Sequence, residues 1–298
     1  MRSPGAESCI GCRAVTIRID IEGVTLDYPV YGASSRTLRS YIASSASGGR
    51  IRKSGHDVLT TRALNELSLS IIEGQRVGLI GTNGSGKSTL LRLIAGVLDP
   101  TEGSLKVKGA VRSLFDLSFG MDEEATGYEN IFIRGLLIGV DRREIARKVD
   151  AIAEFADLGE FMHMPVRTYS SGMRLRLAFA VCTSFPADII LLDEVFGVGD
   201  QTFFEKATER LNHLVGSAGI VLLASHSLGM IRGMCDRVVW INRGELRGNG
   251  PCEEVITEYE AFARAEGVAL LDEEPRSADA KAGANDVSPA AREAASSL

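Results

Sequence analysis

Apolar and polar residues alternate strictly near the start of the chain and again in two later segments. Residues 15–22 place four apolar side chains on one face and four polar side chains on the other, and 67–71 and 105–107 repeat this period of two. Alternation of this kind predicts strands with one buried face and one face in water. Because such strands are typical of antiparallel sheets, we expect an antiparallel β subdomain.

A second kind of strand is apolar along its whole length. Residues 77–80, 189–192 and 220–224 are continuous aliphatic runs, and each is followed by polar residues. Runs like these lie in the middle of a parallel sheet, where helices cover both faces. The run 238–241 and the turn 242–244 predict a closing hairpin. The chain is therefore expected to be an α/β protein with a mixed, largely parallel sheet.

Helical spacing appears between these strands. Asp141 and Glu144 have the spacing of a capping box, and apolar residues then recur every three or four positions up to Ala156. Residues 169–180 begin with small residues and predict a tight turn that opens an amphipathic helix. Together these signals predict a helical subdomain over about 115–180.

Composition and charge narrow the class of protein. The chain has 298 residues, of which 33 are Lys or Arg and 39 are Asp or Glu, so its net charge is −6. Hydrophobic residues make up 45% of the chain, as in ordinary folded domains. No apolar run reaches the roughly 18 residues of a transmembrane helix. The acidic balance also argues against nucleic acid as a partner.

The predicted domain covers residues 15–262. Two segments flank it, and a third is an insertion within it. Residues 1–14 are expected to be a flexible N-terminus, and residues 263–298 a disordered tail without aromatic residues. Residues 32–62 carry six Lys or Arg residues against one Asp. This basic insertion either faces anionic lipid or a membrane partner, or is a solvated loop.

Two cysteines in the N-terminal segment have C-x-x-C spacing. Cys9 and Cys12 could form a zinc or redox site, or could be ordinary thiols in an unstructured tail. No second pair accompanies them, and no strand-to-helix context surrounds them. We therefore read all five cysteines of the chain as free thiols in a reducing compartment.

The run GTNGSGKST matches the phosphate-binding pattern G-x-x-x-x-G-K-S/T, between the apolar strand 77–80 and a helical run. Its glycines let successive N–H groups point at phosphate oxygens at the positive end of a helix. The Lys87 ammonium is expected to contact the β- and γ-phosphates, and the Ser88 hydroxyl to bind Mg²⁺. We assign the whole loop to nucleotide binding: Gly81, Thr82, Asn83, Gly84, Ser85, Gly86, Lys87, Ser88 and Thr89.

Polar residues follow two of the other apolar strands. Asp193 and Glu194 end the strand 189–192, where Asp193 is expected to hold Mg²⁺ through water and Glu194 to orient the attacking water. The alternative is that both acids cap a following helix. His226 follows the strand 220–224, at the edge where ligands collect in open α/β sheets, and is expected to contact the γ-phosphate. The catalytic candidates are Lys87, Glu194 and His226, and the metal candidates Ser88 and Asp193.

The turn before the helix 169–180 offers a second place for an anion. Ser170, Ser171 and Gly172 would present a hydroxyl and N–H groups at a helix N-terminus. One chain cannot place two such cradles on one γ-phosphate. We therefore expect the second cradle to come from another copy of the chain, in a head-to-tail dimer.

These motifs, in this order, resemble those of the ATP-binding subunits of ABC transporters over residues 15–260. YSSGM at 169–173 stands in the place of the family signature, Asp200 in that of the D-loop aspartate, and His226 in that of the H-loop histidine. Tyr28 resembles the aromatic residue that stacks on adenine, or is a core tyrosine at a strand end. The resemblance implies an ABC-type P-loop NTPase core with a mixed parallel sheet, an antiparallel β subdomain and an α-helical subdomain.

One departure concerns the glutamine of the family's Q-loop. The chain contains only Gln75 and Gln201, so no glutamine stands in the segment 115–127. Asp116 is the nearest polar candidate for that position. The metal contact and the coupling role of the family glutamine have no direct counterpart here.

Narrower features resemble polysaccharide exporters. They are the YSSGM signature, TGYENI at 126–131, VFGVGDQTFFEK at 195–206, and the first strand with its tyrosine and proline followed by the basic insertion. The resemblance implies an ATPase that binds ATP and Mg²⁺ and drives export of a lipid-linked polysaccharide of O-antigen, capsule or teichoic acid type. Its partners would be a second copy and an integral membrane permease, coupled through 115–169. Such a subunit is peripheral, on the cytoplasmic face of the inner membrane.

Two alternatives stay open. The ATPase could energise a transporter for another substrate. It could also be a soluble ABC ATPase that acts on ribosomes or nucleic acid, which predicts tandem cassettes and basic stripes. Against the second alternative, the chain holds a single cassette and a net charge of −6.

Overall fold

The computed structural model describes residues 16–29, 51–53, 59–115, 117, 120–193 and 201–267, with the backbone alone at 51–53, 59 and 201–202. Three predicted functional residues lie outside the described residues: Asp116, Glu194 and Asp200. The same holds for the N-terminal segment with its cysteine pair, for most of the basic insertion and for residues 268–298.

An antiparallel sheet forms one layer of the molecule. Its strand order is β2-β3-β1-β5, and every neighbouring pair is antiparallel. Ile19 and Ile21 lie opposite Ile71 and Leu69, and all four side chains are buried. The antiparallel sheet that the alternation predicts is thus confirmed. Its strands are β1 (Arg18–Pro29), β2 (Ile51–Lys53), β3 (Leu59–Ile72) and β5 (Glu102–Lys108).

A six-stranded sheet forms the second layer, in the order β10-β9-β4-β8-β7-β6. All its neighbouring pairs are parallel except β9 and β10, which form the predicted closing hairpin. The expected mixed, largely parallel sheet is therefore confirmed. Its strands are β4 (Arg76–Ile80), β6 (Val111–Ser113), β7 (Ile189–Asp193), β8 (Ile220–Ala224), β9 (Arg237–Asn242) and β10 (Glu245–Pro251).

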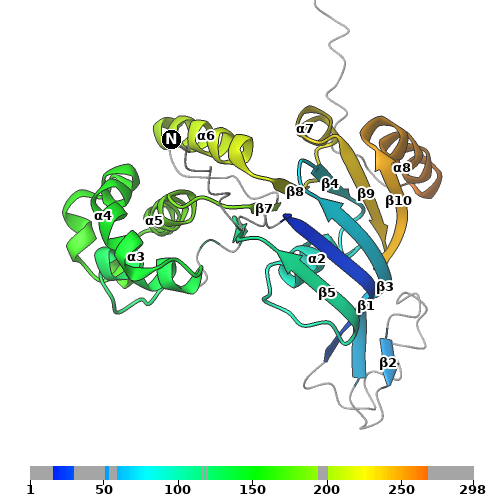
Figure 1. The fold of residues 1–298 in the computed structure, drawn as a ribbon, viewed down its shortest axis with the longest axis horizontal. Coiled ribbons are helices and arrows are strands. Elements are labelled where there is room, and N and C mark those ends of the chain that lie inside the picture. The colour runs from blue at the N-terminus through cyan, green and yellow to red at the C-terminus, as the bar shows by residue number, and fades with distance from the viewer. Residues whose placement is uncertain are drawn as a thin grey trace, which may run out of the picture.

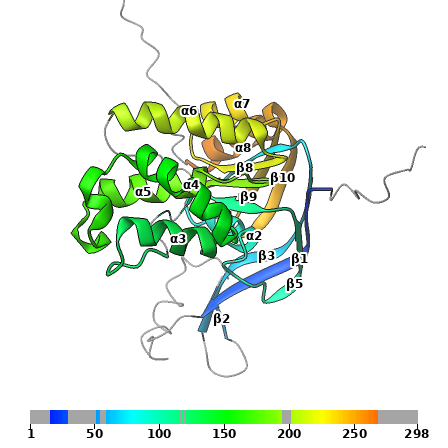
Figure 2. The same cartoon turned by 60° about the vertical axis from the view of Figure 1, so that its left-hand side comes forward.

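The apolar strands are continuous because both faces of this sheet are covered. In β7, Ile189 and Leu191 pack with α2 and the antiparallel sheet, whereas Ile190 and Leu192 pack with the helices of the opposite face. Figure 2 shows α6, α7 and α8 on one side of the sheet and the antiparallel strands on the other. These helices are α2 (Lys87–Ile94), α6 (Gln201–Ser217), α7 (Leu228–Met234) and α8 (Cys252–Glu266).

The last helix crosses a predicted boundary. The domain was expected to end at residue 262, but α8 continues to Glu266, because the fully buried Ala263 packs its last turn onto the core. Among the described residues, no helix combines the length and apolar character that a bilayer crossing requires.

A helical region stands beside the sheets (Figure 1) and has its own apolar cluster. Its main helices are α3 (Gly127–Leu137), α4 (Arg142–Ala156) and α5 (Ser171–Thr183). Two short 3₁₀ helices, η1 (Gly159–His163) and η2 (Val166–Thr168), connect α4 to α5. These elements occupy most of the segment predicted to be helical.

Two local predictions in this region are wrong. Asp141 marks the start of the helix as predicted, and its carboxylate caps α4 by accepting from the N–H of Arg143 at 2.8 Å, but no capping box with Glu144 closes there. A complete box forms instead at the start of α3, between Thr126 and Glu129. The helix α5 is not amphipathic, because its second half is packed between two apolar clusters and every residue from 177 to 183 is buried.

Candidate nucleotide-binding site

The phosphate-binding loop connects the buried end of β4 to the start of α2. Its glycines at 81, 84 and 86 have φ angles of 145°, 69° and 117°, in the region that favours glycine. A Cβ on Gly81 would overlap the carbonyl oxygen of Ile241, and one on Gly86 would lie 2.9 Å from that of Ala63. Gly86 also caps α2 without a side-chain hydrogen bond, so the first amides of the helix can serve a phosphate.

Lys87 is bent back over this loop. Its Nζ donates to the carbonyl oxygens of Gly81 (2.6 Å) and Thr82 (3.3 Å), and only 7% of the residue is exposed. A buried ammonium group needs such oxygen partners. The loop thus holds a positive charge against its own carbonyl oxygens, in the lining of the cavity that would take the phosphates.

The strands bring three predicted elements to one edge of the sheet. Asp193 ends β7 opposite Ala224 of β8, and Leu79 of β4 pairs with the same residue from the other side. His226 follows β8 by two residues. As a result, a cavity of about 160 Å³ is lined by Ala63, Asn83, Gly84, Ser85, Gly86, Lys87, Ser88, Thr89, Asp193 and His226.

His226 sits in a turn that is fixed on both sides. The Oγ of the buried Ser225 accepts from the N–H of Ser227, at 3.0 Å. Ser227 in turn caps α7 by accepting from the N–H of Met230, at 3.2 Å. These two hydroxyls hold the imidazole at the carboxyl edge of the sheet.

The donor atoms of the cavity fit Mg²⁺. The Ser88 hydroxyl and the Asp193 carboxylate are oxygen ligands, which this ion prefers. In the described part of the chain, no group of three or more His, Cys, Asp or Glu side chains could enclose a metal ion. A site with few protein ligands suits Mg²⁺, because the ion keeps several waters and binds substrate phosphates.

Support for the loop comes from segments that the sequence did not single out. The N–H of Gly244, in the β9–β10 turn, donates to the carbonyl of Ser85 at 2.7 Å, and the N–H of Asn65 donates to the carbonyl of Gly244 at 2.9 Å. Ala63 of β3 also lines the cavity. The hairpin-turn pattern at 242–244 marks Gly244 as a turn residue but not as a support of the phosphate-binding loop. No pattern in the sequence indicates the contact of Ala63 with the loop.

Tyr28 lies apart from this cavity. It is half-buried, packs against the apolar cluster beneath the antiparallel sheet, and pairs with Thr61 of β3. Beside it, the Arg62 guanidinium binds both carboxylate oxygens of Asp27, at 2.9 and 3.0 Å, which raises the pKa of Arg62. Tyr28 thus lies opposite Thr61, two residues along β3 from the cavity-lining Ala63. Tyr28 itself does not line the cavity.

The signature turn also lies outside this cavity. Ser170 caps α5 by accepting from the N–H of Met173, at 3.2 Å. Ser170 and Ser171 are exposed, and a Cβ on Gly172 would meet only the Ser170 Oγ, at 3.9 Å. The structure thus separates the two predicted phosphate cradles within one chain.

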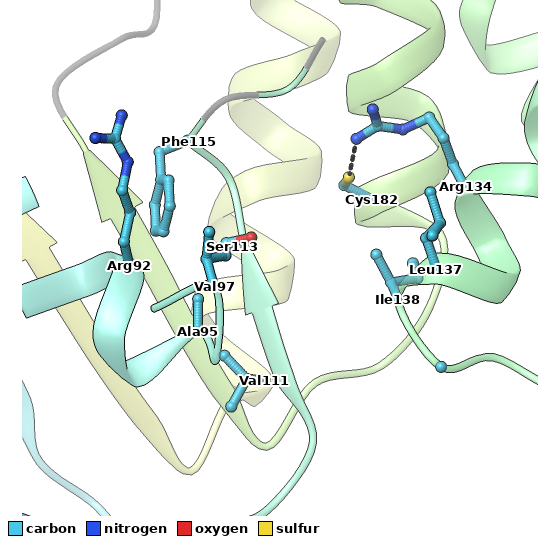
Figure 3. Close-up of a pocket in the computed structure, with 11 residues that line it drawn as sticks. Arg92, Ala95, Val97, Val111, Ser113, Phe115, Arg134, Leu137, Ile138 and Cys182 are labelled. Atoms are coloured by element: carbon cyan, nitrogen blue, oxygen red, sulfur yellow. Dashed lines mark hydrogen bonds between the residues drawn. The ribbon is translucent and has the colours of Figure 1, made fainter. Parts of the chain in front are cut away.

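A larger cavity, of about 470 Å³, opens between the edge strand β6 and the helical region (Figure 3). Leu137 and Val97 on its rim are 64% and 56% exposed. Deeper inside, the guanidinium of Arg134 donates to the Sγ of Cys182, at 3.2 Å. We call this cavity the groove. It is lined by Arg92, Ala95, Val97, Val111, Ser113, Phe115, Arg134, Leu137, Ile138, Gly139 and Cys182.

The solved structures that are similar share the fold. The ATP-binding subunit of an ABC transporter matches with a TM-score of 0.58 at 20% identity, over 86% of this chain and 96% of that one. The ATP-binding cassette MJ0796, a dimer bound to ADP and Pi after hydrolysis, matches with a TM-score of 0.56 at 21% identity, over 78% and 98%. The expected ABC-type core is thus confirmed.

Sequence comparison identifies the family. The family model for ABC transporters matches residues 64–197. The O-antigen export system ATP-binding protein RfbE of Yersinia enterocolitica is 44% identical over 223 residues, 75% of this chain and 93% of that protein. The teichoic acids export ATP-binding protein TagH of Listeria monocytogenes is 36% identical over 248 residues, 83% and 71%. The chain therefore belongs to the ATP-binding proteins of ABC transporters.

Proposed function

We propose that this chain hydrolyses ATP to drive export of a lipid-linked polysaccharide, of O-antigen or capsule type, through a separate permease. The main observation in support of ATPase activity is that the phosphate-binding loop, Asp193 and His226 line one cavity. The class of substrate is supported by the relatives, which are named for O-antigen and teichoic acid export.

Four residues of the cavity have a part in the proposed reaction. Lys87 binds the β- and γ-phosphates, and His226 donates a hydrogen bond to the γ-phosphate. Ser88 and Asp193 would hold Mg²⁺, which neutralises phosphate charge when bound. Glu194, next in the chain after Asp193, would orient the attacking water. Positioning of this kind accounts for most of the catalysis in phosphoryl transfer.

The second cradle comes from another copy of the chain in this proposal. Ser170, Ser171 and Gly172 do not line the cavity of their own phosphate-binding loop; the two serines are exposed and Gly172 is half-buried. In a head-to-tail dimer they would meet the γ-phosphate held by the partner, together with Asp200. The dimer of MJ0796 supports this arrangement by its likeness in fold.

The groove is the proposed contact with the permease. Its rim is apolar, and among the residues that the structure describes its lining includes two arginines and no carboxylate. Such a surface fits a cytoplasmic segment of an integral membrane protein that carries apolar side chains and an acidic one. Binding there would hold the subunit peripherally at the cytoplasmic face of the inner membrane.

Substitution of the proposed base tests the ATPase. We expect Glu194→Gln to keep ATP binding, to lose turnover and to accumulate as a dimer with MgATP in light-scattering measurements. Lys87→Ala is the control, since it should remain monomeric with the same nucleotide. Hydrolysis at the wild-type rate by Glu194→Gln would refute the role of the glutamate.

The substrate is tested separately, with the permease present. In vesicles that contain the subunit and its permease, addition of the lipid-linked polysaccharide should raise the ATPase rate and move the glycan across the membrane. Stimulation by an unrelated substrate and not by the glycan would refute polysaccharide export, while leaving the ATPase assignment intact.

A further inference from the structure

The segment 122–126, which we call the strap, runs beside the chain that leads into the signature turn. The N–H of Val166 donates to the carbonyl of Ala125 at 3.0 Å, and the N–H of Arg167 to that of Glu123 at 2.9 Å. Thr126 and Pro165 form an isolated antiparallel bridge. The strap thus fixes the backbone three to five residues before Ser170.

One buried side chain on α3 holds the strap in shape. Asn130 is fully buried, and its Oδ1 accepts from the N–H of Asp122 at 2.9 Å. Its Nδ2 lies within hydrogen-bond distance of three carbonyl oxygens, those of Asp122 (2.9 Å), Ala125 (3.2 Å) and Thr126 (3.0 Å). An amide accepts at its oxygen and donates at its nitrogen, whereas an ionised carboxylate of the same shape only accepts. The strap therefore depends on asparagine at this position.

A second contact fixes Tyr169, the residue just before the signature serine Ser170. The hydroxyl of Tyr169 donates to the carbonyl of Phe161 at 2.6 Å. It lies so close to Gly127, at the start of α3, that a Cβ there would overlap it. Tyr169 is thereby held between α3 and the 3₁₀ helix η1, and its phenol anchors the start of the turn.

An ion pair connects the strap to the first turn of α5. The guanidinium of Arg174 binds the carboxylate of Glu123 at 3.1 Å. The N–H of Arg174 also donates to the carbonyl of Ser170, at 3.1 Å. The strap thus contacts the signature turn on both sides of Ser170.

We propose that Asn130 and Tyr169 are positioning residues for the reaction, because they set where Ser170 of one copy meets the nucleotide bound to the other. This rests on the proposed function. It also gives the TGYENI run a role: Thr126 caps α3, Gly127 admits the Tyr169 hydroxyl, and Asn130 closes the strap. None of these residues lines the nucleotide cavity of its own chain.

Releasing the strap is therefore expected to impair hydrolysis in the dimer and to leave ATP binding by the single copy unchanged. A chain with a displaced signature turn keeps its own phosphate-binding loop, so a single copy still binds ATP. It completes the partner's site poorly, and a misplacement of about 1 Å in such a group can cost roughly a hundredfold in rate.

Two small substitutions test the proposal. Asn130→Asp removes the donors of the amide at constant shape, and Tyr169→Phe removes one hydroxyl. We expect both to keep the wild-type affinity of the single copy for a fluorescent ATP analogue. We expect kcat to fall about tenfold or more for Asn130→Asp, with a smaller fall for Tyr169→Phe. In a Glu194→Gln background, MgATP should assemble both dimers only at higher protein concentration.

A charge exchange keeps the test decisive if Asn130→Asp fails to fold. Glu123→Arg and Arg174→Glu should each lower kcat, and the double variant should recover most of it at unchanged ATP affinity. Wild-type kcat in Tyr169→Phe and in both charge variants would overturn the proposal. Its failure differs from failure of the proposed function, in which the wild-type chain itself would neither bind nor hydrolyse ATP.

Discussion

The phosphate-binding loop and the signature turn are proposed to serve the same kind of nucleotide, yet they are built in opposite ways. The loop is shaped by backbone: its glycines have positive φ, and at Gly81 and Gly86 neighbouring carbonyls exclude a side chain. The signature turn is exposed, has room at Gly172, and is held by side chains from another part of the helical region.

This difference explains how one chain could separate binding from hydrolysis. The loop has its shape within one copy, because the carbonyls of Ile241 and Ala63 border its glycines where the two sheets pack. The turn lies in the helical region and outside the cavity of the loop, so a shift of that region can move the turn without disturbing the loop. Binding is then a property of one copy, and turnover depends on how two copies meet.

The largest effect is expected at the loop. Lys87→Ala removes the positive charge that lies over the loop, so the single copy should lose most of its affinity for ATP. Turnover should fall by about a hundredfold or more, the cost of deleting one charged or donor group at a reacting centre. Isothermal titration with the ATP analogue and a phosphate-release assay measure the two losses, and they should appear together.

At the signature turn the two losses should separate. Ser170→Ala is expected to lower turnover by about a hundredfold, since one donor to the transferred phosphate is missing, while ATP affinity of the single copy is unchanged. The variant also loses a helix cap, at about 1 kcal/mol of stability. Asp141→Ala is the matched control, because it loses the cap of α4 and leaves that of α5 in place, and it should turn over normally.

Replacing a glycine by alanine should change the free energy of unfolding in opposite directions in the phosphate-binding loop and in the signature turn. Gly81→Ala forces a side chain against the Ile241 carbonyl at a φ of 145°, and should lower the free energy of unfolding by about 1–3 kcal/mol. Gly172→Ala has space inside a helix and should raise it by about 0.5–1 kcal/mol. Urea unfolding measures both, and an equal loss at the two positions would erase the distinction drawn here.

The smallest effect concerns pH. Hydrogen bonds from the backbone and side chain of Thr126 lower the pKa of the exposed Glu129 carboxyl below its ordinary value of 4.5. The carboxylate therefore stabilises the fold above pH 4.5, and this contribution is lost as the pH falls through the folded-state value. Glu129→Gln should remove that part of the acid sensitivity, measured as the difference in unfolding midpoint between pH 7 and pH 4.

The layers of the fold were predictable because periodicity reports burial directly. Alternation at 15–22 and 67–71 indicated half-exposed strands, and continuous apolar runs indicated the central parallel sheet. The amphipathic prediction for α5 was wrong for the same reason: periodicity cannot show that two separate clusters cover opposite faces of one helix.

The contents of the cavity were also predictable, since the motif and the strand ends converge by topology alone. The supports were not. Gly244 and Ala63 come from distant parts of the chain, and their contact with the loop depends on how two sheets pack. Likewise, Asp141 and Thr126 begin similar sequence patterns, but only the Thr126 side chain reaches the third amide of its helix.

The central claim, that two copies must meet before ATP is hydrolysed, is tested most directly by dilution. We expect the ATPase rate per chain to rise with protein concentration below the dissociation constant of the MgATP-bound dimer, and to level off above it. The same curve for Ser170→Ala should stay low throughout. A rate per chain that is constant over the whole range, and equal in the two proteins, would contradict the account.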